Sequence, residues 1–210
     1  MRFFRSSLII VALALACPVA AIAEEPLITP ASPEAKPAET WPAPLKDEPS
    51  REERIDSLFT ELKRERSADG ANAIAQRLWR ELNDSGSPTV NLLMKWADDA
   101  TKDKRNAAAF DFLDQAAVLE PDFAGVWNRR ALLNHALGND KKAMSDLNRV
   151  LEREPRHLIA LAALAAILEE SGDSQGALTA WQRYLDFYPA DRDAQNKVTT
   201  LSEKIAGSRA

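Results

Sequence analysis

A recurrence of 34 residues is the feature that most limits what this chain can fold into. Pro121, Pro155 and Pro189 are separated by this step, and each follows a run of helix-forming residues. Several columns of alanine, of large apolar residues and of glycine keep the same step. They are Ala75, Ala109, Ala143 and Ala177; Ala97, Ala131 and Ala165; Leu93, Trp127 and Leu161; Leu113, Leu147 and Trp181; and Gly70, Gly138 and Gly172, with Lys104 where a fourth glycine would stand. The agreement of these columns predicts a repeat architecture.

Each repeat predicts two helices joined by a short turn. The alanine columns suit such a pair, because two helices approach closely only where side chains are small. The glycine column marks the turn within the pair, and proline fits beyond the second helix, where it cannot continue the helical hydrogen bonding. One pair cannot bury its own apolar face, so the pairs must stack. We therefore expect an all-α fold, a short solenoid of helix–turn–helix repeats.

The columns also carry a resemblance to a known family. The spacing of Trp127, Ala131, Gly138, Ala143 and Leu147, closed by Pro155, resembles the tetratricopeptide repeat (TPR). The expected organisation is a signal peptide at 1–23, a proline-rich linker at 24–52, a degenerate TPR-like helical pair at 53–87, TPR units at 88–121, 122–155 and 156–189, and a capping helix at 190–206.

Two residues of the second unit depart from the family pattern. Arg130 stands where the family prefers an aliphatic residue, and Asn134 where it prefers tyrosine. They weaken the expectation of tight packing in that unit's first helix. As a whole, the chain resembles small periplasmic TPR proteins of alphaproteobacteria, a group linked to cell-envelope integrity.

The N-terminal sequence pattern predicts a secretory signal. Arg2 and Arg5 precede an apolar run that ends in Ala21-Ile22-Ala23, so we expect cleavage after Ala23 and a periplasmic protein. Pro18 interrupts the run, which is too short for a membrane span. The alternative is a lipoprotein anchored at Cys17, the only cysteine of the chain. Only that form would bring the protein to a membrane.

Composition excludes one class of partner. Cleavage after Ala23 removes two arginines and no acidic residue, which moves the formal net charge from −5 to −7. An acidic chain is a poor match for the phosphate backbone, so nucleic acid is not an expected partner. The linker at 24–52 holds seven prolines and one tryptophan, Trp41, and favours an extended spacer.

The sequence offers little catalytic chemistry. His135 and His157 are the only histidines, and neither has the spacing of a zinc site. We expect His135 to be solvated or to cap a helix, and His157 to be exposed in a turn between repeats. Ser85 and Ser87 flank Gly86 without an evident base, so Ser87 or Thr89 is better explained as a helix cap, in a joint between two units. We expect no catalytic residue, no metal and no cofactor; a hydrolase built on Ser85 or Ser87 is the least favoured reading.

The resemblance implies that the first helix of each unit lines a concave groove for partner peptides. The residues expected there are Asn91, Lys95, Asp98, Lys102, Asn128, Arg129, Leu132, His135, Ile159, Ala162, Ala163, Ala166 and Glu169. Met94 stands at a position where chaperone-binding members carry a lysine of their carboxylate clamp, so that ligand is not expected. If the proline-rich arm or a second copy of the chain covers this face, its apolar residues belong to a buried core and do not form an open groove.

The sequence therefore predicts a non-catalytic adaptor that binds a protein or peptide partner of unknown identity. A tethered lipoprotein with a structural role is the alternative, and self-association is compatible with both.

Overall fold

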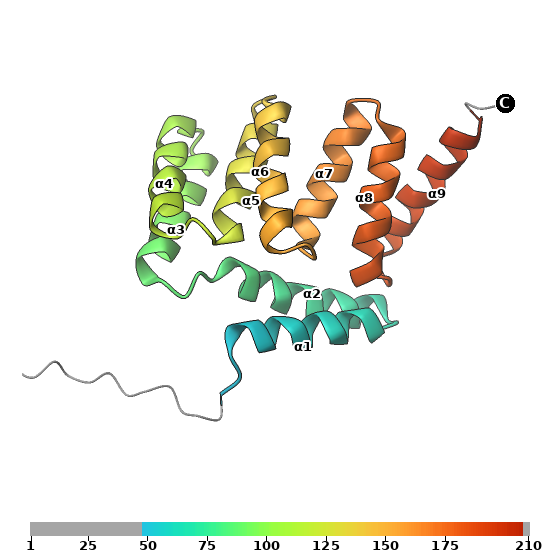
Figure 1. Ribbon diagram of the computed structural model, residues 1–210, viewed down its shortest axis with the longest axis horizontal. Coiled ribbons are helices and arrows are strands. Elements are labelled where there is room, and N and C mark those ends of the chain that lie inside the picture. The colour runs from blue at the N-terminus through green and yellow to red at the C-terminus, as the bar shows by residue number, and fades with distance from the viewer. Residues whose placement is uncertain (1–47, 208–210) are drawn as a thin grey trace, which may run out of the picture. The chain divides into compact units, whose positions relative to one another are not determined.

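The computed structural model describes residues 48–207, and within them the fold is entirely helical (Figure 1). The predicted signal, Cys17, Trp41 and most of the linker lie outside the described residues. Three helical pairs follow one another as α3–α4, α5–α6 and α7–α8, and α9 comes last. Their bounds are α3 Pro88–Lys102, α4 Asn106–Leu119, α5 Ala124–Ala136, α6 Asp140–Arg153, α7 Leu158–Glu170, α8 Ser174–Phe187 and α9 Arg192–Gly207. The predicted all-α solenoid is confirmed.

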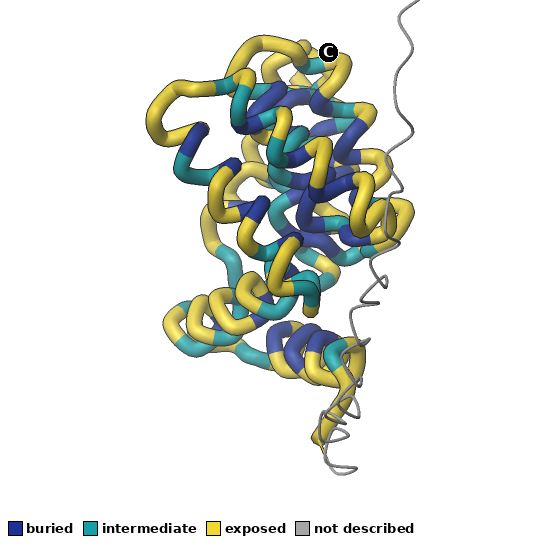
Figure 2. The backbone as a smooth tube through the Cα atoms, turned by 90° about the vertical axis from the view of Figure 1, so that its left-hand side faces the viewer, coloured by how far each residue is buried: buried dark blue, intermediate teal, exposed yellow. Residues whose placement is uncertain are grey.

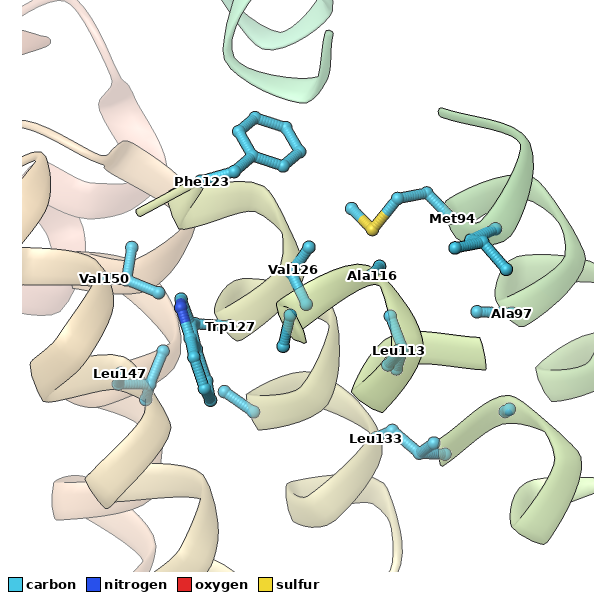
Figure 3. Packing of buried hydrophobic residues seen from close by; sticks show 14 of the residues in the cluster. Met94, Ala97, Leu113, Ala116, Phe123, Val126, Trp127, Leu133, Leu147 and Val150 are labelled. Atoms are coloured by element: carbon cyan, nitrogen blue, oxygen red, sulfur yellow. The ribbon is translucent and has the colours of Figure 1, made fainter. Parts of the chain in front are cut away.

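The repeat columns form the contacts between helices. Ala109, Ala143 and Ala177 are fully buried, and the second alanine column, from Ala97 to Ala165, is at most 1% exposed. Figure 3 shows the core between them, with Leu113 of α4, Trp127 of α5 and Leu147 of α6 pointing into one cluster. Small residues at the close approaches and large ones between pairs are what the packing of stacked helices requires.

The backbone conformation of the turns within the pairs accounts for the glycine column and for Lys104, the one residue that departs from it. Gly138 and Gly172 adopt φ values of 72° and 87°, and Lys104 takes φ 58° at the corresponding turn between α3 and α4. The turn therefore demands the left-handed conformation even where a side chain makes it costly. Gly70 differs. It lies inside α2 (Ala68–Asn83), where its N–H donates to the Ser67 side chain, so its place in the glycine column is a coincidence.

The two departures from the family pattern compensate each other. Asn134 donates to the carboxylate of Asp146 at 3.3 Å, and the Arg130 guanidinium lies 3.4 Å from the same oxygen. Asp146 is 5% exposed, and burial raises its pKa. Arg130 also lies over the Trp127 ring, 5.2 Å from its centroid. The first helix of this unit, α5, still buries the Trp127 side chain in the core. Asp146 offsets both polar residues, by a hydrogen bond from Asn134 and an ion pair with Arg130, whose buried Nε has no hydrogen-bond partner in the described residues.

The first helical pair is the largest difference from the expected arrangement. α1 (Arg51–Arg64) starts after a capping box of Ser50 and Glu53, and α2 follows after a three-residue turn. The pair does not stack in front of α3–α4. It lies across the ends of the later pairs, as Figure 1 shows, and its main contacts outside itself are with α8 and α5.

Aromatic rings and one ion pair dock this first pair. The rings of Phe59 and Phe187 lie 5.9 Å apart, and the Tyr188 hydroxyl donates to the Asn72 side chain at 2.9 Å. Arg156 bonds Asp56 at 2.7 Å and lies 4.4 Å above the Phe59 ring. Phe187 is the last residue of α8, and Tyr188 and Arg156 lie in the turns that follow α8 and α6. Figure 2 shows buried stretches in this pair as well as in the stack, and the buried residues of α1 and α2 form one apolar cluster with the start of α7 and the end of α8.

Candidate partner-binding groove

The loop before α3 is a structural joint. Ser87 caps α3, accepting from the Val90 N–H, and Pro88 takes the first helical position, which confirms one of the two predicted caps. Ser85 donates to the Asn91 side-chain oxygen at 2.8 Å, and the Asn91 amide donates to Asp84 at 2.7 Å. The Gly86 N–H and then Asn91 hold the pKa of Asp84 below its ordinary value. Asn91, expected in the groove, is therefore bound into this joint.

The two lysines expected in the groove are paired at its margin. Lys95 lies 2.6 Å from Asp99, one helical turn on, and Lys102 lies 3.7 Å from the same carboxylate. This hydrogen bond raises the pKa of Lys95 and lowers that of Asp99. Lys95 shares a helix face with Leu92 and Trp96, both nearly half exposed, and not with the buried Met94. Its charge is thus directed away from the inner face of α3.

Arg129 ties three helices together. Its guanidinium donates to Asp98 of α3 at 2.9 Å and to Asn83 of α2 at 2.7 Å, and only 16% of its side chain is exposed. The neighbouring Asn128 is 3% exposed, and its side-chain oxygen has no hydrogen-bond donor in the described residues. α2 therefore covers the beginning of the surface that α5, the first helix of its pair, was expected to present to the groove. The element that covers part of the groove is the chain's own first pair.

The remaining predicted residues lie further along α5 and α7. His135 bonds the Asp140 side chain through Nδ1 at 2.8 Å and so joins the end of α5 to the start of α6. This bond caps neither helix, so the capping role considered for His135 is not observed. Ala163 and Ile159 are both partly exposed, and Ala163 packs against the main core. Glu169 is paired with Lys197 at 3.3 Å. Of the thirteen residues expected at the groove, Ile159 is the one that lines a cavity with α2.

That cavity lies between α2, the start of α7 and the end of α8. Its volume is about 250 Å³. It is named here the Trp79 cavity, because the Trp79 side chain borders it and is 49% exposed. Its lining is mostly apolar and consists of Asn72, Ala75, Gln76, Leu78, Trp79, Leu82, Asn83, His157, Leu158, Ile159, Tyr184 and Tyr188.

Sequence reasoning missed the α2 side of this cavity. Trp79 falls in the column of Leu113 and Leu147, which are 1% and 0% exposed, and the pattern therefore predicts a buried side chain. Nothing in the pattern reveals that α2 leaves the 34-residue register of the later pairs. The feature that marks the site is the half-exposed side chain of Trp79, and this exposure is known only from the three-dimensional structure.

His157 corrects another expectation. It was expected to be exposed in a turn, but it is 1% exposed and caps α7, where its Nδ1 accepts from the Ala160 N–H. Burial lowers its pKa to about 4, against the opposing charge of Glu154, so the ring stays neutral. The sequence alone does not show that α1–α2 closes over this turn.

The ionisable groups around the cavity are poorly suited to catalysis. Burial raises the pKa of both Tyr184 and Tyr188, and the Tyr184 hydroxyl donates to Asp191 at 2.7 Å. With His157 neutral, none of these three groups changes its protonation near neutral pH. Neither histidine bonds a serine in residues 48–207, and in that range no group of three or more acidic, His or Cys side chains is placed to hold a metal ion. The same residues include no helix that is long and apolar enough to cross a membrane.

Comparison with known proteins gives the family. No family model matches the chain. A curated TPR repeat-containing protein of Rhizobium etli is 57% identical over 160 residues, which are 76% of this chain and 78% of the relative. This chain belongs to the TPR repeat proteins. The resemblance inferred from the 34-residue columns is confirmed, and an alphaproteobacterial relative agrees with it.

The fold also has solved counterparts among TPR domains. The first TPR of Spaghetti, solved bound to an HSP90 peptide, superposes with a TM-score of 0.53 at 19% identity, covering 57% of this chain and 95% of that one. This likeness concerns the fold. TPR proteins are in general protein-interaction scaffolds, and TPR repeats are typically non-catalytic.

Proposed function

We propose that this TPR protein is a non-catalytic adaptor that holds an apolar side chain of an extended partner segment in the Trp79 cavity. One observation carries the proposal: a tryptophan that is 49% exposed borders an apolar cavity of about 250 Å³. Binding sites are typically concave and apolar, with a few polar groups that fix orientation. Gln76 of α2 provides such a group, and the amide of Asn72 provides a second, since only its oxygen is engaged, by Tyr188.

The rest of the partner segment has a path along α7. Ala162, Ala163 and Ala166 lie three, four and seven residues after Ile159, so the four residues share one helix face, and all four are partly exposed. Their small side chains let a peptide backbone approach closely. The solved TPR of Spaghetti with its bound HSP90 peptide supports a peptide as the class of ligand.

Two tryptophans of nearly equal exposure provide the decisive experiment. Trp79 is 49% and Trp96 is 45% exposed, but Trp96 lies on α3, outside the lining of the cavity. A library of displayed peptides is selected on the wild-type protein, and the enriched peptides are then tested against Trp79→Ala and Trp96→Ala. Peptides with an apolar anchor should lose at least about tenfold in affinity for Trp79→Ala alone. Equal binding to all three proteins would remove the cavity from the proposal.

Reversing the charge of Arg129 would be a poor test of the same site. Its bonds to Asp98 and Asn83 hold α3 and α2 against α5, so this change disturbs the fold together with the groove. Ile159→Lys is a better second variant, because it introduces a charge into the cavity wall from a partly exposed position.

We further propose that the protein works in the periplasm and supports envelope integrity or assembly. The support is the N-terminal pattern, with Arg2 and Arg5, an apolar run and Ala21-Ile22-Ala23. The mass of the mature N-terminus distinguishes the two possible products. Release beginning at Glu24 supports a free periplasmic protein, whereas an acylated Cys17 would replace it with the tethered form.

A further inference from the structure

The end of the stack at α3–α4 presents an apolar surface. Leu92 and Trp96 of α3 are 44% and 45% exposed, and Leu119 of α4 is 54% exposed. The Trp96 and Phe112 rings lie 5.5 Å apart, and Leu119 is two helical turns beyond Phe112 on the same face of α4. These four residues are named here the end face.

The end face is open because of where α1–α2 lies. In a continuous stack, the pair that precedes α3–α4 would cover this surface, as α3–α4 itself is followed by α5–α6. Here α1–α2 lies across the ends of other pairs, and its docking contacts are with α5 and α8 (Figure 1). No other described helix takes its place at α3.

The charges on the end face are self-complementary. Lys95 and Asp99 flank Trp96 on the exposed side of α3, four residues apart, with side chains 68% and 43% exposed. If two copies of α3 cross antiparallel about a point midway between these residues, Lys95 of each copy faces Asp99 of the other. Trp96 is one residue from that point, so the two rings would lie about 3 Å apart along the helix axis. A two-fold contact requires this kind of self-matching surface.

We infer that the end face is the contact between two copies of this chain, which associate into a two-fold dimer through α3. The two intrachain Lys95–Asp99 pairs, one in each copy, are then exchanged for two pairs between copies, and Trp96 provides the apolar centre. This inference is independent of the Trp79 cavity.

Charge variants test it by a prediction that only a two-fold contact makes. Lys95→Asp leaves acidic residues at both positions 95 and 99, and Asp99→Lys leaves basic residues at both, so each variant alone meets like charges at these positions of the other copy. Each should weaken self-association at least about tenfold. An equal mixture of the two variants should associate again, because the acidic helix of one then faces the basic helix of the other.

The measurement is sedimentation equilibrium on the chain as it is recovered from cells that make it, over a range of concentrations. Trp96→Ala should also weaken the dimer, whereas Trp79→Ala should leave it intact. Lys197→Asp is the matched control, because it breaks an exposed ion pair with Glu169 far from α3 along the chain. Circular dichroism checks that every variant remains helical.

Three results would overturn the inference. In the first, the wild-type chain stays monomeric at every concentration. If deletion of residues 24–47 then allows a dimer to form, the end face is covered by the chain's own N-terminal arm in the full chain, and the inference is wrong in that case too. The two charge variants could associate as the wild type does. Their mixture could also fail to associate when each alone is weakened.

Discussion

The two ends of the repeat stack are finished in opposite ways. At the C-terminal end, α9 buries Ala194 and Leu201 against the last pair and exposes polar residues such as Asn196 and Thr200. At the other end, Leu92 and Trp96 of α3 remain nearly half exposed. A solenoid needs a polar cap at each end to stay soluble. The difference arises because the first helical pair does not cap α3–α4 and packs instead across the ends of the later pairs.

The difference in burial between the two ends is tested most directly by shortening one leucine at each end. Leu201→Ala removes a side chain that is 2% exposed, so we expect a loss of about 2–5 kcal/mol in the free energy of unfolding. Leu92→Ala changes a side chain that is 44% exposed in the single chain, so at a concentration where the chain is monomeric its free energy of unfolding should stay within about 0.5 kcal/mol of the wild type. Urea denaturation followed by circular dichroism measures both. Similar losses at the two ends would mean that the end face is already covered in the folded monomer.

The docked pair makes a second prediction, through pH. The pKa of His157 is lowered to about 4 from the ordinary 6.5, so between these values the unfolded chain binds a proton that the folded chain does not. Stability therefore falls as pH falls through this window, by up to about 3 kcal/mol in total.

The control for this prediction is His157→Asn, which retains a side chain able to cap α7 but does not titrate. Its free energy of unfolding should lose less between pH 6.5 and 4 than that of the wild type. Parallel pH profiles would show that α1–α2 does not close over His157 in solution.

A smaller effect concerns the turns inside the pairs. Gly138 has φ 72°, and Gly138→Ala should cost about 1 kcal/mol. Lys104 has φ 58° at the corresponding turn of the end pair, so Lys104→Gly should stabilise by about 0.5–1 kcal/mol. Melting temperatures should move in opposite directions. If Lys104→Gly lowers the melting temperature, the lysine side chain contributes a contact that outweighs its backbone strain.

Much of the solenoid was predictable because its contacts are local. Within 88–189, each column residue packs against its own pair or the next, so the spacing in the sequence determines the neighbour in space. The left-handed Lys104 belongs to this part, since its column already placed it at a turn. The candidate site was less predictable. Ile159 was expected at the groove, whereas Trp79 was assigned to the core by a register that α2 does not keep.

The helical pairs, their turns and the stacking order of α3 to α9 follow from the repeat pattern, because alanine, glycine and proline at a fixed period leave few alternatives. The position of α1–α2 does not follow from that pattern and depends on contacts formed in the folded chain. Its four-residue connection, Asp84–Ser87, is as long as the one between α4 and α5 and permits stacking equally well. Long-range contacts such as Phe59–Phe187 and Tyr188–Asn72 select the docked position instead. That choice buries His157, creates the Trp79 cavity and leaves Trp96 exposed.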